Sequence, residues 1–293
     1  MKVAVFGKQI TEDSRESVEN LYRLLKESGT QITVSVHLAE FVKEHCDLEL
    51  DFDIFRDRFE MVAQEPDFVL TLGGDGTILD AATWVRDSQI PILGINTGRL
   101  GFLANVSKDK IPQAIDALNK GNFAIKERTM LQLHSDDGVQ LDPNFALNEL
   151  TVSRKATTSM ITIKVFINGE FLNAYWADGL IIATPTGSTG YSLSCGGPII
   201  MPGSENFVIT PIAPHNLNVR PFVIPNNYSI TLRIETREKE YLTSLDSRIH
   251  TFPGTTTLTV QRAPYKLRLV ETDIQDFPTT LRNKLLWGLD RRN

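Results

Sequence analysis

The chain has 293 residues, and its 30 lysines and arginines against 36 aspartates and glutamates give a net charge of −6. No basic block is present to follow a nucleic-acid backbone, and no stretch approaches the roughly 18 apolar residues of a membrane-spanning helix, so neither partner is expected. Cys46 and Cys195 are too few for a disulfide framework or a cysteine zinc site. We expect a soluble cytoplasmic protein of two domains.

Strand-like and helix-like segments alternate along the first 125 residues. Apolar runs predict strands at residues 2–6, 31–37, 68–72 and 91–95, and apolar residues at helical spacing predict helices at 17–25 and 111–118. This order is typical of an open, mostly parallel sheet that binds ligands at the carboxyl ends of its strands. We assign residues 1–125 to an α/β domain. The C-terminal segment 275–293, helix-like at 281–287, is expected to join it.

After residue 125 the sequence changes to threonine, valine and isoleucine in period-two runs. Strands are predicted at residues 161–167, 181–184, 229–235, 257–262 and 266–270. The dipeptides Asp137-Gly138 and Asn168-Gly169 are hairpin signals. We therefore expect residues 126–274 to form a mostly-β, sandwich-like domain.

The motif GGDGT at residues 73–77 separates a predicted strand from a helix-like segment. Glycines let the backbone come close to a ligand, and a helix N-terminus presents N–H groups and partial positive charge to phosphate. An aspartate there repels phosphate unless a cation or a hydroxyl mediates. Asp75 is therefore interpreted as the group that handles an acceptor hydroxyl or a cation. The alternative is a tight turn in which Asp75 is the N-cap.

Two further segments carry binding chemistry. Residues 177–192 offer hydroxyls and unhindered amides after a buried strand, and Tyr191 adds a ring for contact with a base, which is typical of a nucleotide cradle. The alternative is a surface turn rich in serine and threonine. Asn148 and Glu149 would suit a ribose diol or an adenine edge, or else form a cross-strand pair. The five histidines show no metal-ligand spacing, so no zinc site is expected.

In this order the motifs resemble those of the NAD kinase family along nearly the whole chain. The matching segments are GGDGT, LGINTGRLGFL at 93–103, Asn148-Glu149, and residues 178–198, 211–215, 220–221 and 281–287. A GGDGT turn alone also occurs in diacylglycerol kinases, sphingosine kinases and phosphofructokinases. The joint set is specific to NAD kinases.

The resemblance implies ATP-dependent phosphorylation of the 2′-hydroxyl of the adenosine ribose of NAD, with Mg²⁺ or Mn²⁺ accompanying ATP and NADP as the product. In family terms Asp75 orients or deprotonates that hydroxyl. Asn148 and Glu149 hold the adenine and ribose side of NAD, and Asp178 lies near its nicotinamide side. The other binding residues implied are Gly74, Gly76, Thr77, Phe102, Ser188, Thr189, Gly190, Tyr191, Ser192, Leu193, Ser194 and Ala213. No residue is assigned as a metal ligand, and a homodimer or homotetramer is implied.

Several positions depart from the commonest family pattern. Gly190 stands where alanine is usual, and Cys195 where alanine is frequent. Trp176 occupies a position that is often basic, which puts a charge contact to the dinucleotide there in doubt. Asp-Ser-Arg at residues 246–248 replaces Asp-Gly-Gln, and no role is carried over to Arg248.

Two other functions stay open at this point. One is a kinase of a lipid or sugar phosphate that shares the GGDGT turn, although no amphipathic membrane-facing stretch supports a lipid substrate. The other is a non-catalytic NAD(P)-binding sensor, against which the presence of Asp75 argues. The phosphoryl donor, ATP or polyphosphate, also stays open.

Overall fold

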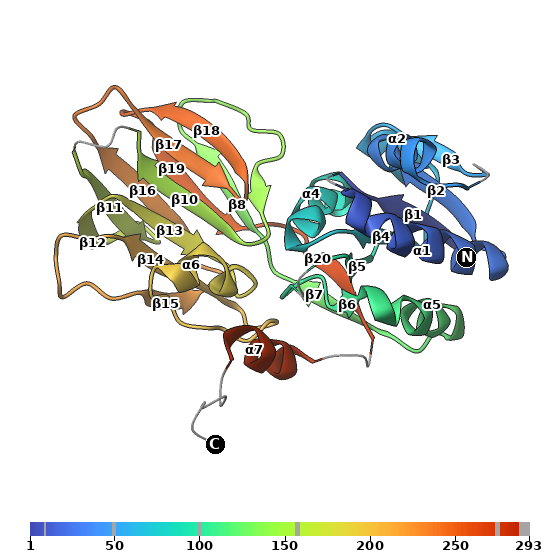
Figure 1. The fold of residues 1–293 in the computed structure, drawn as a ribbon. Helices are drawn as coiled ribbons and strands as arrows, with labels where there is room; N and C mark the ends of the chain where they lie inside the picture. The colour runs from blue at the N-terminus through green and yellow to red at the C-terminus, as the bar shows by residue number, and fades with distance from the viewer. Residues whose placement is uncertain (9, 49–50, 99–100, 156–158, 273–275, 287–293) are drawn as a thin grey trace, which may run out of the picture. The chain divides into compact units, whose positions relative to one another are not determined.

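The structure, a computed structural model, describes residues 1–8, 10–48, 51–98, 101–155, 159–272 and 276–286. The chain divides into two compact units (Figure 1). Unit 1 consists of Met1–Glu127 and Leu267–Asn293, and unit 2 of Arg128–Lys266. None of the described helices is long and apolar enough to cross a membrane.

Unit 1 is built on one sheet with the strand order β3-β2-β1-β4-β5-β20-β7, and β6 pairs beside β5. Its strands are β1 (Lys2–Phe6), β2 (Gln31–Ser35), β3 (Asp53–Phe55), β4 (Phe68–Leu72), β5 (Ile92–Asn96), β6 (Val106–Ser107), β7 (Ala124–Arg128) and β20 (Leu267–Glu271). The pairs that join β1 to β2 and β4, and β5 to β4, β6 and β20, are parallel. The chain reverses its direction of travel across the sheet between β1 and β4. Ligands of such sheets bind beside the carboxyl ends of the strands at this point.

Helices cover both faces of this sheet. They are α1 (Arg15–Glu27), α2 (Val36–His45), α3 (Arg58–Ala63), α4 (Asp75–Val85) and α5 (Ile111–Lys120), with short 3-10 turns at Glu12–Ser14, Arg86–Ser88 and Lys108–Lys110. The last helix of unit 1 is α7 (Phe277–Leu285). The apolar faces of α1, α2 and α5 share one buried cluster with Val5 and Leu70. Because side chains alternate along a strand, Phe6 and Phe55 point to the other face, where both contact the ring of Trp84 in α4.

Unit 2 is a sandwich of two antiparallel sheets, with strand orders β15-β14-β13-β10-β17-β18 and β12-β11-β16-β19-β8-β9. Its elements are β8 (Leu131–Ser135), β9 (Phe145–Ala146), β10 (Glu149–Arg154), β11 (Ile161–Ile167), β12 (Glu170–Ala177), β13 (Gly179–Ala183), η4 (Gly187–Thr189), α6 (Tyr191–Ser194), β14 (Asn206–Ile212), β15 (Phe222–Pro225), β16 (Ile230–Glu235), β17 (Glu240–Leu245), β18 (Arg248–Pro253) and β19 (Thr257–Arg262). Residues from both sheets, such as Val152 of β10 and Ile163 of β11, share one buried core. The predicted fold class is confirmed.

Three expectations about local structure need correction. The strand expected at residues 31–37 ends at Ser35, because Leu38, Phe41 and Val42 are buried on one face of α2, which begins directly afterwards. The strand expected at 266–270 forms as β20, but it pairs with β5 in unit 1. Asp137-Gly138 lies in a longer connection, residues 136–144, between the paired strands β8 and β9.

The hairpin predicted at Asn168-Gly169 is confirmed. Both residues have positive φ angles, 50° and 86°, in the turn between β11 and β12. The last helix, α7, begins and ends earlier than expected, at Phe277 and Leu285. Trp287, the last residue of the expected helix, lies outside the described residues.

Candidate active site

The GGDGT turn follows β4, at the carboxyl edge of the sheet of unit 1. The N–H of Gly73 donates to the carbonyl of Ile95 at 3.0 Å, which fixes the turn against β5. Helix α4 begins at Asp75, and its N-cap is Gly74. Asp75 is therefore the first helical residue rather than the cap, and the alternative interpretation of this turn is wrong.

The Asp75 carboxylate binds the loop that follows β5. Its Oδ2 accepts the N–H of Phe102 at 2.8 Å, and its Oδ1 accepts the N–H groups of Leu103 and Ala104 at 3.0 and 2.9 Å. A Cβ atom at Gly101 would lie 1.7 Å from Oδ1, so only glycine permits this approach. Because each carboxylate oxygen accepts two hydrogen bonds, Oδ2 keeps capacity for one more donor. The carboxylate is thus fixed in direction and still able to bind a hydroxyl.

The glycines of the turn differ in whether the fold requires glycine at their position. Gly73 has a φ of 149°, and a Cβ there would lie 2.1 Å from the Thr77 hydroxyl. Gly74 and Gly76 have ordinary φ angles, and no atom lies within 4 Å of a Cβ built on either. The fold itself therefore does not require glycine at these two positions. Bare backbone at the start of a helix is what a phosphate group needs for close approach.

Two more side chains of unit 1 lie near this turn. Lys8, in the loop after β1, places its ammonium group 3.3 Å from Asp80 of α4. Lys8 was not among the predicted site residues, although a cation directly after the first strand of such a sheet can be recognised in the sequence. The Phe102 ring lies 6.2 Å from the ring of Phe277 in α7, and the Lys284 ammonium lies 5.0 Å from the Phe102 centroid. Arg99 and Leu100 of the same motif lie outside the described residues.

In unit 2, Asn148 and Glu149 lie at the start of β10 and carry unsatisfied acceptors. Asn148 Oδ1 and Glu149 Oε2 are buried and accept no hydrogen bond. A Cβ at Gly187 would lie 2.1 Å from the Asn148 carbonyl oxygen, and a Cβ at Gly190 would lie 3.0 Å from Glu149 Oε2. The loop after β13 therefore packs closely over both residues. Orphaned acceptors in a buried place are costly unless a ligand satisfies them.

Glu149 has a strongly perturbed acidity. Burial, with a smaller contribution from the charge of Asp246, raises the pKa of its carboxyl group from 4.5 to about 8, and the Tyr191 N–H opposes both effects. Glu149 is therefore protonated at neutral pH and can donate a hydrogen bond as well as accept one. Such shifts are common at functional sites.

Three of the predicted residues line one pocket of about 420 Å³ on unit 2: Glu149, Asp178 and Tyr191. The other lining residues are Thr151, Ser153, Arg154, Ile212, Leu242, Thr243, Ser244, Asp246 and Ile249. Arg154 pairs with Asp178 at 3.0 Å between Nη2 and Oδ2. Sequence reasoning missed this arginine, because nothing local connects it with an aspartate in the connection between β12 and β13.

The serines of the predicted cradle are used inside the protein. Ser188 Oγ donates to the Pro185 carbonyl at 2.7 Å and accepts the N–H of Ile200 at 3.0 Å. Ser192 Oγ lies 2.8 Å from the Thr210 hydroxyl. Ser188 and Ser192 are fully buried, so the segment is not a loose surface turn. The side chains of Ser188 and Ser192 stabilise the loop. Any contact of these two residues with a ligand must therefore be made by their backbone atoms.

The remaining predicted cradle residues surround this core. Thr189 and Leu193 are half-buried, Ser194 is exposed, and the Tyr191 ring is 46% exposed at the pocket wall. Ala213 follows β14 with a φ of 43°, a left-handed conformation that costs energy for a residue other than glycine. Such strain often accompanies function.

Three family-variant positions acquire defined environments. Trp176 is half exposed, and its ring lies 4.2 Å from that of His215, whose N–H donates to the Trp176 carbonyl. Burial raises the pKa of the Cys195 thiol, which favours a packing role over a reactive thiolate. Arg248 donates to the Phe145 carbonyl.

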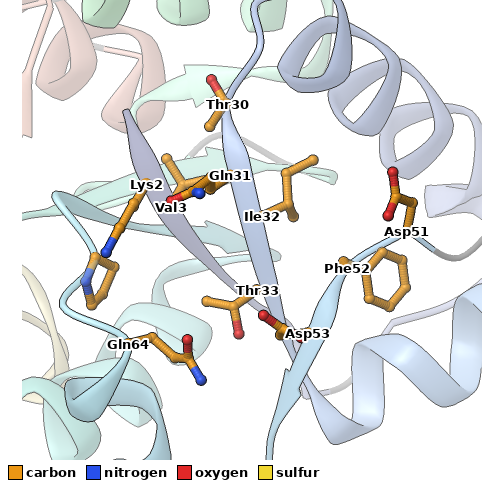
Figure 2. Close-up of a pocket in the computed structure, with 11 residues that line it drawn as sticks. Lys2, Val3, Thr30, Gln31, Ile32, Thr33, Asp51, Phe52, Asp53 and Gln64 are labelled. Carbon is orange, nitrogen blue, oxygen red and sulfur yellow. The ribbon is translucent and has the colours of Figure 1, made fainter.

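A separate hollow of about 660 Å³ lies in unit 1 at the amino ends of β1, β2 and β3 (Figure 2). In Figure 2 the side chains of Lys2 and Gln64 lie to the left of those of Thr33 and Asp53. None of the predicted site residues lines it. It opens at the end of the strands opposite to the GGDGT turn, so it is not the candidate site.

Comparison with known proteins identifies the family. The ATP-NAD kinase N-terminal domain matches residues 3–123, and the ATP-NAD kinase C-terminal domain matches residues 147–272. The chain belongs to the NAD kinase family. The NAD kinase of Flavobacterium psychrophilum is 47% identical over 295 residues, which cover all of both chains.

Solved structures of NAD kinases share the fold. Yeast NADH kinase in complex with NADH has a TM-score of 0.88 at 25% identity, covering 99% of this chain and 88% of that one. An NAD kinase from Archaeoglobus fulgidus in complex with ATP has a TM-score of 0.73 at 23% identity, covering 97% of each chain. The resemblance found in the sequence is confirmed, and nothing supports a lipid or sugar-phosphate kinase.

Proposed function

We propose that this chain transfers the γ-phosphate of ATP to the 2′-hydroxyl of the adenosine ribose of NAD, forming NADP. The observation that carries the proposal is the Asp75 carboxylate, held by three loop amides beside the bare backbone of Gly74 and Gly76. Family membership over the full length supports the same reaction.

In the proposed reaction Asp75 orients the acceptor hydroxyl. The hydroxyl donates to Oδ2, which turns its oxygen toward the γ-phosphorus, and the proton passes to the carboxylate as the new P–O bond forms and the bond to ADP breaks. Phosphoryl transfer requires little covalent participation by the protein, so alignment of the acceptor hydroxyl with the γ-phosphate supplies most of the catalysis. A carboxylate is too weak a base to ionise an alcohol beforehand. Phosphate binding is assigned to the amides of Gly74 and Gly76, whereas the Thr77 N–H donates to the Gly74 carbonyl at 3.0 Å and Thr77 is assigned through its hydroxyl.

The divalent cation is proposed to arrive with ATP. Mg²⁺ commonly keeps several waters and binds substrate phosphates rather than an all-protein cage. Within the part of the chain that the structure describes, no group of three or more His, Cys, Asp or Glu side chains is placed to hold a metal. When bound, Mg²⁺ or Mn²⁺ neutralises phosphate charge, and we assign it no protein ligand.

NAD recognition is assigned to unit 2. Asn148 Oδ1 and Glu149 Oε2 are buried acceptors without partners, and Glu149 bears a proton at neutral pH, so the pair offers donors and acceptors for adenine and ribose. Asp178, paired with Arg154, and Tyr191 line the same pocket. We place the nicotinamide side near Asp178, with Ala213 as a further contact.

The decisive experiment is NADP formation from NAD, ATP and Mg²⁺ by the purified protein, read with an NADP-specific dehydrogenase. The Asp75→Asn variant keeps the size of the side chain but loses the negative charge and turns an N–H donor toward at least one of the three loop amides. We expect its turnover to fall by about 10²-fold or more while NAD, assigned to unit 2, still binds. Full activity of Asp75→Asn would refute the role of Asp75. Absence of wild-type turnover with NAD bound in calorimetry would indicate a sensor or another donor, such as polyphosphate.

We also propose that the chain assembles as a homodimer or homotetramer in the cytoplasm. Exposed apolar side chains on unit 2, including Ile249 at the pocket and Phe222 and Val223 on β15, support self-association. The two free thiols, Cys46 and Cys195, support a reducing compartment. Light scattering over a dilution series tests the assembly, and a monomer at micromolar concentration would contradict it.

A further inference from the structure

The turn between β17 and β18 carries a buried carboxylate. Asp246 and Ser247 form this two-residue turn, since Leu245 pairs with Arg248. The Asp246 side chain is only 1% exposed. The cost of burying a charge is large unless hydrogen bonds or an opposite charge compensate it. Because glycine or asparagine would form such a turn without that cost, the carboxylate needs another explanation.

The partners of Asp246 lie about a hundred positions earlier in the chain. Its Oδ2 accepts the N–H of Leu147 at 3.0 Å, and its Oδ1 accepts the N–H groups of Asn148 and Glu149 at 2.8 and 3.3 Å. The Asp246 N–H donates in return to the Glu149 carbonyl at 2.9 Å. Arg248 Nη1 lies 3.9 Å from Oδ2 and offsets part of the charge.

The same segment is held from its other side by Thr184. The Thr184 hydroxyl donates to the Leu147 carbonyl at 2.5 Å, and the Thr184 N–H donates to the Asn148 carbonyl at 2.9 Å. The backbone groups of residues 147–149 are therefore committed to Asp246 and Thr184. The side-chain acceptors Asn148 Oδ1 and Glu149 Oε2 are left buried without partners.

We propose that Asp246 is a positioning residue for NAD binding, which acts by fixing the backbone of residues 147–149 so that Asn148 and Glu149 point at the dinucleotide. This inference rests on the function proposed above. Asp246 is among the residues that line the pocket, but its side chain is only 1% exposed, so it acts through the segment rather than through a contact of its carboxylate with NAD. A carboxylate is the group required, since it offers only acceptors to three convergent N–H donors.

The test is Asp246→Asn. The new amide group turns N–H donors toward at least one of the three loop N–H groups, which loosens the segment. We expect the Kd for NAD, measured by calorimetry, to rise about tenfold, which corresponds to about 1.4 kcal/mol. ATP binding should stay within about twofold of the wild-type value, because the backbone assigned to phosphate lies at the GGDGT turn.

Asp137→Asn is the matched control. Asp137 also lies in a turn of unit 2 and accepts a backbone amide, that of Val139 at 3.0 Å, together with the Thr256 hydroxyl at 2.9 Å, and neither partner belongs to residues 147–149. We expect this variant to bind NAD as the wild type does. An Asp246→Asn protein that melts lower but binds NAD as tightly as Asp137→Asn would show a merely structural aspartate and overturn the proposal.

Two further measurements keep the inference testable whatever the variants do. Thr184→Val removes the hydroxyl on the other side of the segment, and it should also weaken NAD binding. If neither variant folds, hydrogen exchange in the wild type decides, because the amides of residues 147–149 should be protected and rapid exchange there would exclude the proposal. All of these results are read from binding or exchange. A wild type that binds NAD without making NADP would therefore refute the reaction and leave this test intact.

Discussion

At the residue scale, Glu149 links stability to pH. Its carboxyl group has an ordinary pKa of 4.5 and a folded-state pKa of about 8, so the folded protein holds a proton that the unfolded chain has lost across this interval. The stabilisation is complete below about pH 4.5 and is lost as the pH rises through 8. The native protein should therefore be less stable at pH 8 than at pH 5.5 because of this one side chain.

Glu149→Gln isolates the effect. Glutamine resembles the protonated carboxyl group and does not titrate, so the advantage of the wild type over the variant should shrink by up to about 1.4 kcal/mol for each pH unit in the interval. Urea unfolding at pH 5.5, 6.5 and 8 measures the difference. Burial also raises the pKa of Asp246, and because the charge of Asp246 acts on Glu149, the pH-dependent difference includes the coupling between these two groups. A difference that is independent of pH would show that Glu149 is not the titrating group.

At the element scale, the beginning of α4 separates stability from activity. Gly76 is the second residue of this helix, and a Cβ there meets no atom within 4 Å. Gly76→Ala should stabilise the fold by about 0.5–1 kcal/mol because alanine favours the helix. If phosphate approaches this backbone, the new methyl group should also reduce kcat/KM for ATP by about tenfold or more.

Thermal unfolding and steady-state kinetics together test this. Gln113→Ala, at an exposed position of α5, is the control, and we expect it to change stability by less than about 0.5 kcal/mol and to leave activity unchanged. A Gly76→Ala enzyme that is both more stable and fully active would show that the ligand does not approach the start of α4.

Some of the strands and helices could be predicted from the sequence and others could not. Period and turn chemistry were sufficient for β1, β4, β11 and β19, because each has a local pattern and a clear boundary. Helix α2 was missed because the alternation of Ile32, Val34 and Val36 continues beyond the end of β2. The strand that pairs with β20 could not be predicted, because the residue pattern of a strand does not indicate which sheet the strand joins.

For the site, the candidate residues could be selected from the sequence, but the groups that hold them in place could not. The GGDGT turn and the pair Asn148-Glu149 can be selected by chemistry alone and by family resemblance. The hydrogen bonds that fix them come from the loop at residues 102–104 and from Asp246, far away in the chain. Only the folded chain brings those groups together. The ligand roles of the individual residues stay predictions.

At the scale of the whole molecule, the two units should differ as isolated fragments. Unit 2 is one continuous segment with its own buried core, whereas the sheet of unit 1 needs β20 between β5 and β7. We expect residues 128–266 alone to unfold cooperatively and residues 1–127 alone to lack a stable fold, as thermal unfolding followed by circular dichroism would show. Joining residues 1–127 to 267–293 through a short glycine-serine linker should restore cooperativity, because β7 and β20 are neighbours in the sheet. A stable 1–127 fragment would contradict this expectation.

The late position of β20 also sets an order of events at the ribosome. Domains commonly fold from the N-terminus onward as they are synthesised. Here the first sheet stays open until a strand encoded after residue 266 has emerged, and by then all of unit 2 has been translated. The nascent chain can therefore complete the fold of unit 2 before the sheet of unit 1. Residues 147–149, which are proposed to position the NAD-binding side chains, can fold before the sheet that carries the GGDGT turn is complete.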